Sequence, residues 1–137
     1  MVSHGICPRY SDIDTYHMMA CAIDEALRNF CAVGGNLNHA AGLDNFCWCD
    51  PVTSEKTPDG AFKLAQLVRA CSGLQEGCLS YGIPLISGKD SMKNDALIGG
   101  KKVSVRPTLL VSLMGIIQDV RKAVSTDFKN AGDRIYL

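Results

Sequence analysis

Apolar residues between positions 14 and 33 follow the spacing of one face of an α-helix. They recur every three or four residues, and the set is Tyr16, Met19, Ala20, Ile23, Leu27, Phe30 and Cys31. Gly34 and Gly35 come directly after this run and are typical of a helix end. We therefore predict a helix over about residues 14–33 with this face toward the core.

A second helical pattern covers about residues 57–81. Thr57 offers a capping hydroxyl and Pro58 suits the first turn of a helix. Gly82 and Pro84 end the pattern. The apolar positions again share one face and are Ala61, Leu64, Leu67, Val68, Cys71, Leu74 and Cys78.

Strand patterns are confined to the second half of the chain. Residues 83–87 form a short apolar run, and 103–120 is rich in β-branched residues with one interruption at Pro107. Between them, residues 99–102 predict the tip of a polar turn. The last five residues, 133–137, predict the start of another strand. The remaining segments, 1–13, 36–57 and 121–132, are predicted to be irregular or rich in loops.

Composition narrows the class of protein. The 137 residues suffice for one domain, with 47% apolar and 20% charged residues and a formal net charge of zero. A broad nucleic-acid or membrane surface is therefore not expected. The most apolar run, 108–117, is too short to span a bilayer, and the N-terminus lacks a signal-peptide pattern. The seven cysteines, which lack the CxxC spacing of structural zinc sites, are interpreted as reduced thiols of a cytoplasmic protein.

The first helix carries two polar pairs that are one turn apart. Asp24 and Arg28 predict an ion pair on its flank. Glu25 and Asn29 lie on the opposite side, next to a back face with few charges. Their oxygens could hold Mg²⁺, which prefers hard oxygen ligands. The alternative interpretation is a partly exposed helix on which Glu25 is a surface residue that binds no ligand.

Two further segments offer groups for an anion. In Gly88-Lys89-Asp90-Ser91 the glycine admits a close approach and the lysine can neutralise phosphate. A phosphate-binding P-loop is excluded because Ile83 stands at its first glycine position and Asp90 separates Lys89 from Ser91. A polar turn after a strand is the alternative.

The second of these segments, at 42–51, places Asp44 beside an aromatic cluster. A neighbouring Phe46 and Trp48 would hold the acid rigidly, as a ligand-binding acid requires. The alternative is an Asx-turn in which Asp44 only caps the backbone.

Several blocks together resemble the synthetase subunit of phosphoribosylformylglycinamidine synthase, a family within the aminoimidazole ribonucleotide synthetase-like superfamily. These blocks cover nearly the whole chain and are DEALRN (24–29), AVGG (32–35), LDNFCWCDP (43–51), PLISGKDSMKND (84–95), RPTLLVSLMGIIQDV (106–120) and AGDRIYL (131–137).

The resemblance implies an α+β fold: a mixed or antiparallel four-stranded sheet with helices on one face, which pairs with a like domain into a barrel. It implies that residues 1–132 are the second N-domain of a longer enzyme, followed by the first strand of a C-domain at 133–137. The whole enzyme would use ATP, Mg²⁺ and ammonia from a glutaminase domain or subunit to convert a formylglycinamide ribonucleotide to the amidine. A non-catalytic ADP-binding module and another ATP-dependent enzyme of the superfamily remain as alternatives.

The resemblance also implies roles for residues of this chain. Asp44, Gly88 and Ser91 match nucleotide contacts, and Glu25 and Asn29 match magnesium ligands. Lys89 stands where small forms of the family have an asparagine, so it is expected to neutralise phosphate, with Asp90 orienting it or assisting the metal. The family's catalytic histidine lies in the first N-domain, so no catalytic residue is expected here. The chain alone is expected to be inactive, with a like N-domain or a second copy as partner.

Overall fold

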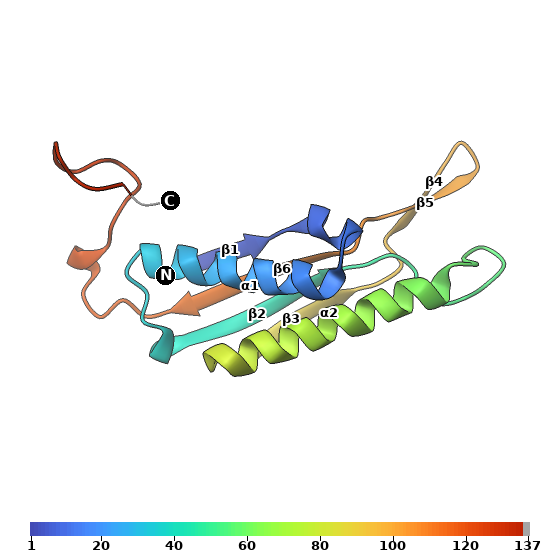
Figure 1. Ribbon diagram of the computed structural model, residues 1–137, viewed down its shortest axis with the longest axis horizontal. Helices are drawn as coiled ribbons and strands as arrows, with labels where there is room; N and C mark the ends of the chain where they lie inside the picture. Colours follow the sequence, from blue (N-terminus) through green and yellow to red (C-terminus); the bar gives the residue numbers. More distant parts are fainter. Residues whose placement is uncertain (136–137) are drawn as a thin grey trace.

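Two helices cover one face of a four-stranded sheet in the computed structural model, which describes residues 1–135 (Figure 1). The helices are α1 (Thr15–Ala32) and α2 (Gly60–Tyr81). The strand order is β1-β6-β2-β3, and only β2 and β3 are parallel. This arrangement confirms the α+β class and the mixed sheet. The four strands are β1 (Val2–Ile6), β2 (Ala40–Cys47), β3 (Leu85–Ser91) and β6 (Thr108–Gly115).

A separate two-stranded hairpin and three short 3₁₀ helices complete the fold. The hairpin strands β4 (Asp95–Ile98) and β5 (Lys101–Ser104) are joined at Gly99 and Gly100, both with positive φ, which confirms the predicted turn. The 3₁₀ helices are η1 (Pro8–Asp12), η2 (Leu37–His39) and η3 (Val120–Lys122). None of the helices in residues 1–135 has the length and hydrophobicity to cross a membrane.

Helix α1 begins where the sequence predicts it. The Asp14 side chain accepts hydrogen bonds from the backbone N–H groups of Tyr16 and His17 and so caps the helix. Its buried face is wider than predicted because β1, β6 and α2 all pack against it. Of the predicted face, Ala20 and Cys31 are exposed. The buried apolar residues are instead Met18, Met19, Ala22, Ile23, Ala26, Leu27 and Phe30.

Helix α2 begins three residues later than predicted and ends as predicted. Gly82 adopts the left-handed conformation (φ 65°), and its N–H reaches the carbonyl oxygens of Cys78 and Leu79. Only a narrow strip of this helix is buried, including Ala70, Gly73 and Leu74. A Cβ on Gly73 would lie 2.8 Å from the carbonyl oxygen of Tyr16, so this glycine permits the close approach of the two helices.

Two strands fall in segments that the sequence predicts to be irregular. Strand β1 occupies part of residues 1–13, and β2 occupies part of residues 36–57. Their Gly5, Gly42, Asp44 and Asn45 are poor strand formers, and pairing with β6 overrides this local preference. The predicted 83–87 strand is β3, which extends to Ser91.

Two strand regions are predicted in the C-terminal part of the chain, at 103–120 and at 133–137. The predicted 103–120 strand region is divided at Pro107: residues 103–104 end β5 of the hairpin, β6 occupies Thr108–Gly115, and residues 116–120 form no strand. Residues 133–135 form no strand, and 136–137 lie outside the described residues. The assignment of 133–137 to a following C-domain therefore stays a prediction.

The core lies between the helices and the sheet. Trp48 and Phe30 are its largest fully buried side chains, and Leu109, Val111 and Leu113 of the central strand β6 point into it. The indole of Trp48 donates a hydrogen bond to the carbonyl oxygen of Lys63 in α2, 3.2 Å away. The other face of the sheet carries no helix, and we call it the open face (Figure 1).

We predict that Gly5→Ala destabilises the fold by about 2–3 kcal/mol because the new Cβ would overlap backbone of α1. That Cβ would lie 1.9 Å from the carbonyl oxygen of Ala22. The matched control is Gly42→Ala, whose Cβ would meet side-chain methyl groups of Leu85 and Ile83, at 3.0 and 3.1 Å, and no backbone atom at a shorter distance. Urea denaturation should give a clearly smaller loss for Gly42→Ala. Equal losses would contradict the importance of the β1–α1 approach.

Candidate functional site

The Gly88–Ser91 segment lies inside strand β3 and not in a turn, which corrects the sequence-based placement. Its partners in β2 are set by the register, with Asp44 opposite Gly88, Asn45 opposite Lys89 and Phe46 opposite Asp90. Because side chains alternate along a strand, neighbouring residues of this segment point to opposite faces of the sheet.

This alternation divides the predicted nucleotide contacts into two groups. Asp44 is paired with the buried Val111 of β6 and therefore faces the helices. Asp90 shares that side with the core residue Phe46. Lys89 and Ser91 alternate with Asp90 and lie on the open face. These residues therefore do not share one side of the sheet, and the nucleotide roles expected for them stay predictions.

A small cavity of about 190 Å³ borders Lys89 on β2, β3 and β6. Asn45, Ser87 and Ser112 supply its polar groups, and the Lys89 ammonium makes no ion pair within residues 1–135. The sequence analysis missed these three polar residues. They alternate with core positions, a signal that becomes readable once β2 and β3 are recognised as strands. The full lining is Leu43, Asp44, Asn45, Ser87, Gly88, Lys89, Leu110 and Ser112.

A glycine at position 88 leaves room for the side chain of Asp44 on the neighbouring strand. A Cβ at position 88 would lie 2.7 Å from Asp44 Oδ1 and 3.0 Å from Oδ2, so the carboxylate occupies the space above this glycine. Burial raises the pKa of the Asp44 carboxyl above its usual value, and the charge of Asp90 raises the pKa further. Within residues 1–135 neither carboxylate is paired with a cation.

Glu25 and Asn29 lie on α1 beside the free edge of β1. Glu25 Oε2 accepts hydrogen bonds from the backbone N–H of Ile6 at 2.7 Å and from the Cys7 thiol at 3.6 Å. The Asn29 amide donates to the carbonyl oxygen of His4 at 2.9 Å. These two side chains thus satisfy backbone groups that an edge strand leaves unpaired.

The donor set of Glu25 and Asn29 still fits part of a magnesium shell. Glu25 Oε1 and Asn29 Oδ1 make no hydrogen bond within the described part of the chain, and both side chains are exposed. They could supply two of the six oxygens that Mg²⁺ requires. Residues 1–135 contain no group of three or more His, Cys, Asp or Glu side chains arranged for a metal.

The Glu25–Asn29 pair and Lys89 are not brought together within residues 1–135. Strands β1 and β3 are the opposite edges of the sheet, and three strand spacings separate them by about 14 Å. Glu25 and Asn29 belong to the β1 edge, whereas Lys89 lies in β3. The cavity beside Lys89 includes neither Glu25 nor Asn29.

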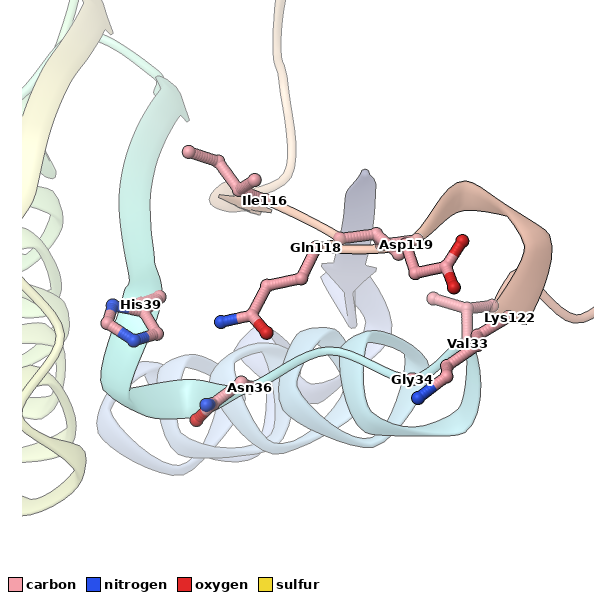
Figure 2. A pocket seen from close by; sticks show the side chains of 9 residues that line it. Val33, Gly34, Asn36, His39, Ile116, Gln118, Asp119 and Lys122 are labelled. Atoms are coloured by element: carbon pink, nitrogen blue, oxygen red, sulfur yellow. The ribbon is translucent and has the colours of Figure 1, made fainter.

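A larger cavity lies elsewhere, at the C-terminal end of α1, with a volume of about 390 Å³ (Figure 2). Asn36, His39 and Gln118 provide its neutral polar groups. Asp119 is held by Arg121 through bonds of 2.8 and 2.9 Å, and Lys122 lies beside Val33 and Gly34 at the negative end of the helix (Figure 2). Asp119 is thus already paired, and the cavity contains no residue predicted to bind a ligand.

Sequence comparison places the chain in a known class of domains. Residues 1–117 match the family model of AIR synthase related protein, N-terminal domain. This match covers most of the chain, so the protein belongs to that family.

Among individual proteins, the chain is similar to the same synthase subunit in different organisms. The chain is 34% identical over 136 residues to phosphoribosylformylglycinamidine synthase subunit PurL of Erythrobacter litoralis, covering 99% of this chain and 17% of the relative. It is 35% identical over 133 residues to the same subunit of Prochlorococcus marinus, covering 96% of this chain and 16% of the relative. The chain therefore spans about one sixth of these proteins.

Solved structures agree on the fold. The structure of PurLQS from Thermotoga maritima superposes with a TM-score of 0.69 at 24% identity, covering 92% of this chain and 19% of that one. Thermotoga maritima PurL complexed with ADP gives a TM-score of 0.63 at 25% identity, covering 83% of this chain and 17% of the other. The mixed sheet with two helices is thus the N-domain architecture of these structures.

We predict that Asp44→Asn stabilises the fold at pH 7. A carboxyl whose folded-state pKa is raised costs stability once the pH exceeds its unfolded-state pKa, and this cost disappears at lower pH. Urea denaturation should therefore show a higher midpoint for Asp44→Asn than for the native protein at pH 7 and no difference at pH 3. The control is Asp24→Asn, which removes an exposed carboxylate paired with Arg28 and should give no gain. A gain of equal size at both pH values would contradict the explanation.

Proposed function

We propose that this chain is an N-domain of an ATP-dependent carbon–nitrogen ligase of purine biosynthesis. The whole protein would convert formylglycinamide ribonucleotide to the amidine with ammonia derived from glutamine. The observation that carries the proposal is the 34% identity to a PurL subunit along 99% of the chain. Structures of Thermotoga maritima PurL complexed with ADP, ATP and FGAR support the ligand class.

The proposed contribution of this chain to phosphate binding is the open face around Lys89. Its ammonium would act as a point charge for phosphate oxygens. The Asn45 amide and the hydroxyls of Ser87 and Ser112 border the same cavity and would donate hydrogen bonds. Ser91 lies two residues farther along the same face and extends this polar surface.

Magnesium fits the proposal at the other edge of the sheet. Glu25 Oε1 and Asn29 Oδ1 would bind the ion, while the hydrogen bonds from Ile6 and to His4 hold both side chains in place. When bound, the ion would screen the negative charge of nucleotide phosphates. Because Lys89 is distant from this pair, we propose that another domain closes the site and that this chain provides only part of it.

A like N-domain is the proposed partner. Pairing of two such sheets into a barrel would leave α1 and α2 on the outside and enclose the open face with Lys89. Residues 133–137 would then lead into a C-domain of the same protein, and a glutaminase domain or subunit would deliver ammonia in the cytoplasm. The PurLQS assembly of Thermotoga maritima supports a multi-component protein of this kind.

We predict that Lys89→Ala and Glu25→Ala each weaken Mg-nucleotide binding by the intact parent protein about tenfold or more, since each removes a charge-assisted contact. Isothermal titration with Mg-ATP and Mg-ADP measures the effect. Lys56→Ala removes an exposed lysine of the loop before α2 and serves as the matched control, which should bind like the native protein.

Turnover in the same variants separates the two roles of the nucleotide. If the variants lose both nucleotide binding and amidine formation, the nucleotide bound here has a direct role in the reaction. Normal turnover by the folded fraction, with lower thermal stability, would assign the nucleotide to a structural module without chemistry. Unchanged binding in both variants would refute the proposed residues.

A further inference from the structure

The β4–β5 hairpin forms an arm that extends from the body of the protein (Figure 1). Each of its strands has four residues, and they pair only with each other. An isolated two-stranded hairpin is marginally stable in water. The arm therefore needs an anchor to hold a fixed position.

A largely buried ionic network supplies that anchor. The Lys102 ammonium lies between the carboxylates of Asp50 and Asp95, at 3.5 and 3.4 Å. Asp95 also accepts a hydrogen bond from the backbone N–H of Asp50, and Lys63 of α2 donates to the Ser104 hydroxyl at 2.8 Å. Hydrogen bonds from the backbone and from Ser104 help to lower the pKa of Asp95, although burial opposes them. Both carboxylates thus stay charged and fix the base of the arm at neutral pH.

Residues on the opposite side of the arm are exposed. Ile98 faces Lys101 across the hairpin, and Ala96 faces Val103, so these four side chains share one side. Ile98 is 64% exposed and Val103 47% exposed. Lys101 makes no ion pair within the described residues. The arm therefore presents an apolar surface beside an available cation.

A complementary groove lies between α2 and the edge strand β3. It has a volume of about 330 Å³ and is lined by Phe46, Leu67, Cys71, Asp90 and Met92. Within residues 1–135, Asp90 lacks a paired cation, like its neighbour Asp44. The charges of both help to raise the pKa of the Cys71 thiol, for which burial is the main cause. The groove is therefore apolar with uncompensated negative charge.

We propose that the arm of one copy of this chain docks into the α2–β3 groove of a second copy, and that the contact is reciprocal. Ile98 and Val103 would cover Leu67 and Met92, and Lys101 would pair with Asp90. A reciprocal contact closes into a symmetric dimer and buries both arms at once. Charge complementarity selects this occupant, since the arm carries the cation and the groove the carboxylate that it can pair with.

Cross-linking tests the contact because the groove already contains Cys71. In the proposed dimer, the thiol introduced by Ile98→Cys would lie close enough to Cys71 of the other copy for a disulfide, which requires Cα atoms about 4.4–6.8 Å apart. Mild oxidation with diamide should give a covalent dimer of the 137-residue chain, identified by mass spectrometry of the linked peptides. The double variant Ile98→Cys/Cys71→Ser should give none.

Charge reversal provides a test that does not depend on oxidation. Lys101→Glu should weaken the dimer about tenfold, since two exposed contacts are lost together. Lys101→Glu/Asp90→Lys should restore it, and Lys129→Glu should leave it unchanged. Sedimentation equilibrium measures the dissociation constants. The proposal would be overturned by a protein that is monomeric at high concentration. It would equally be overturned if the protein dimerises but two results fail together: Lys101→Glu/Asp90→Lys does not restore the dimer affinity, and Ile98→Cys forms no disulfide with Cys71.

Discussion

The register of β2 between β6 and β3 is the constraint on which the candidate site depends. Val111 of the central strand points into the core and fixes its partner Asp44 on the helix side. Strand alternation then places Lys89 on the open face and Asp90 on the helix side. A shift of β2 by one residue would turn Asp44 and the buried Phe46 to the open face. The apolar core therefore decides which polar side chains can meet a ligand together.

Close contact between α1 and β1 positions the other half of the proposed site. Gly5 allows the helix backbone to approach the strand, and Ser3 donates a hydrogen bond to the carbonyl oxygen of Ala26 at 2.8 Å. At this separation Glu25 and Asn29 reach the free edge of β1. The same two side chains thus protect an edge strand, and each has one oxygen without a hydrogen bond within residues 1–135. Their structural role does not conflict with magnesium binding, but it explains their position without a ligand.

The two surfaces that the protein leaves uncovered have different chemistry. The open face presents neutral polar groups around the Lys89 cation, which suits phosphate. The α2–β3 groove presents Asp90 beside thiol, thioether and aromatic side chains, with the charge of Asp44 acting from nearby, which suits a cationic apolar partner. Parallel pairing of β2 with β3 creates this contrast, since successive residues of GKDS serve opposite faces. One short sequence thus contributes to both surfaces.

The sequence by itself determined the two helices, the Asp24–Arg28 pair and the hairpin turn at Gly99–Gly100, because these depend on local periodicity and residue chemistry. Resemblance between sequence blocks added the α+β sheet. Only the tertiary structure decided that β1 and β2 are strands, because their pairing with β6 joins residues far apart in the chain and overrides weak local propensity. For the same reason the neighbours of Lys89, and the Lys102 network that anchors the arm, could not be predicted: long-range register sets which side chains meet.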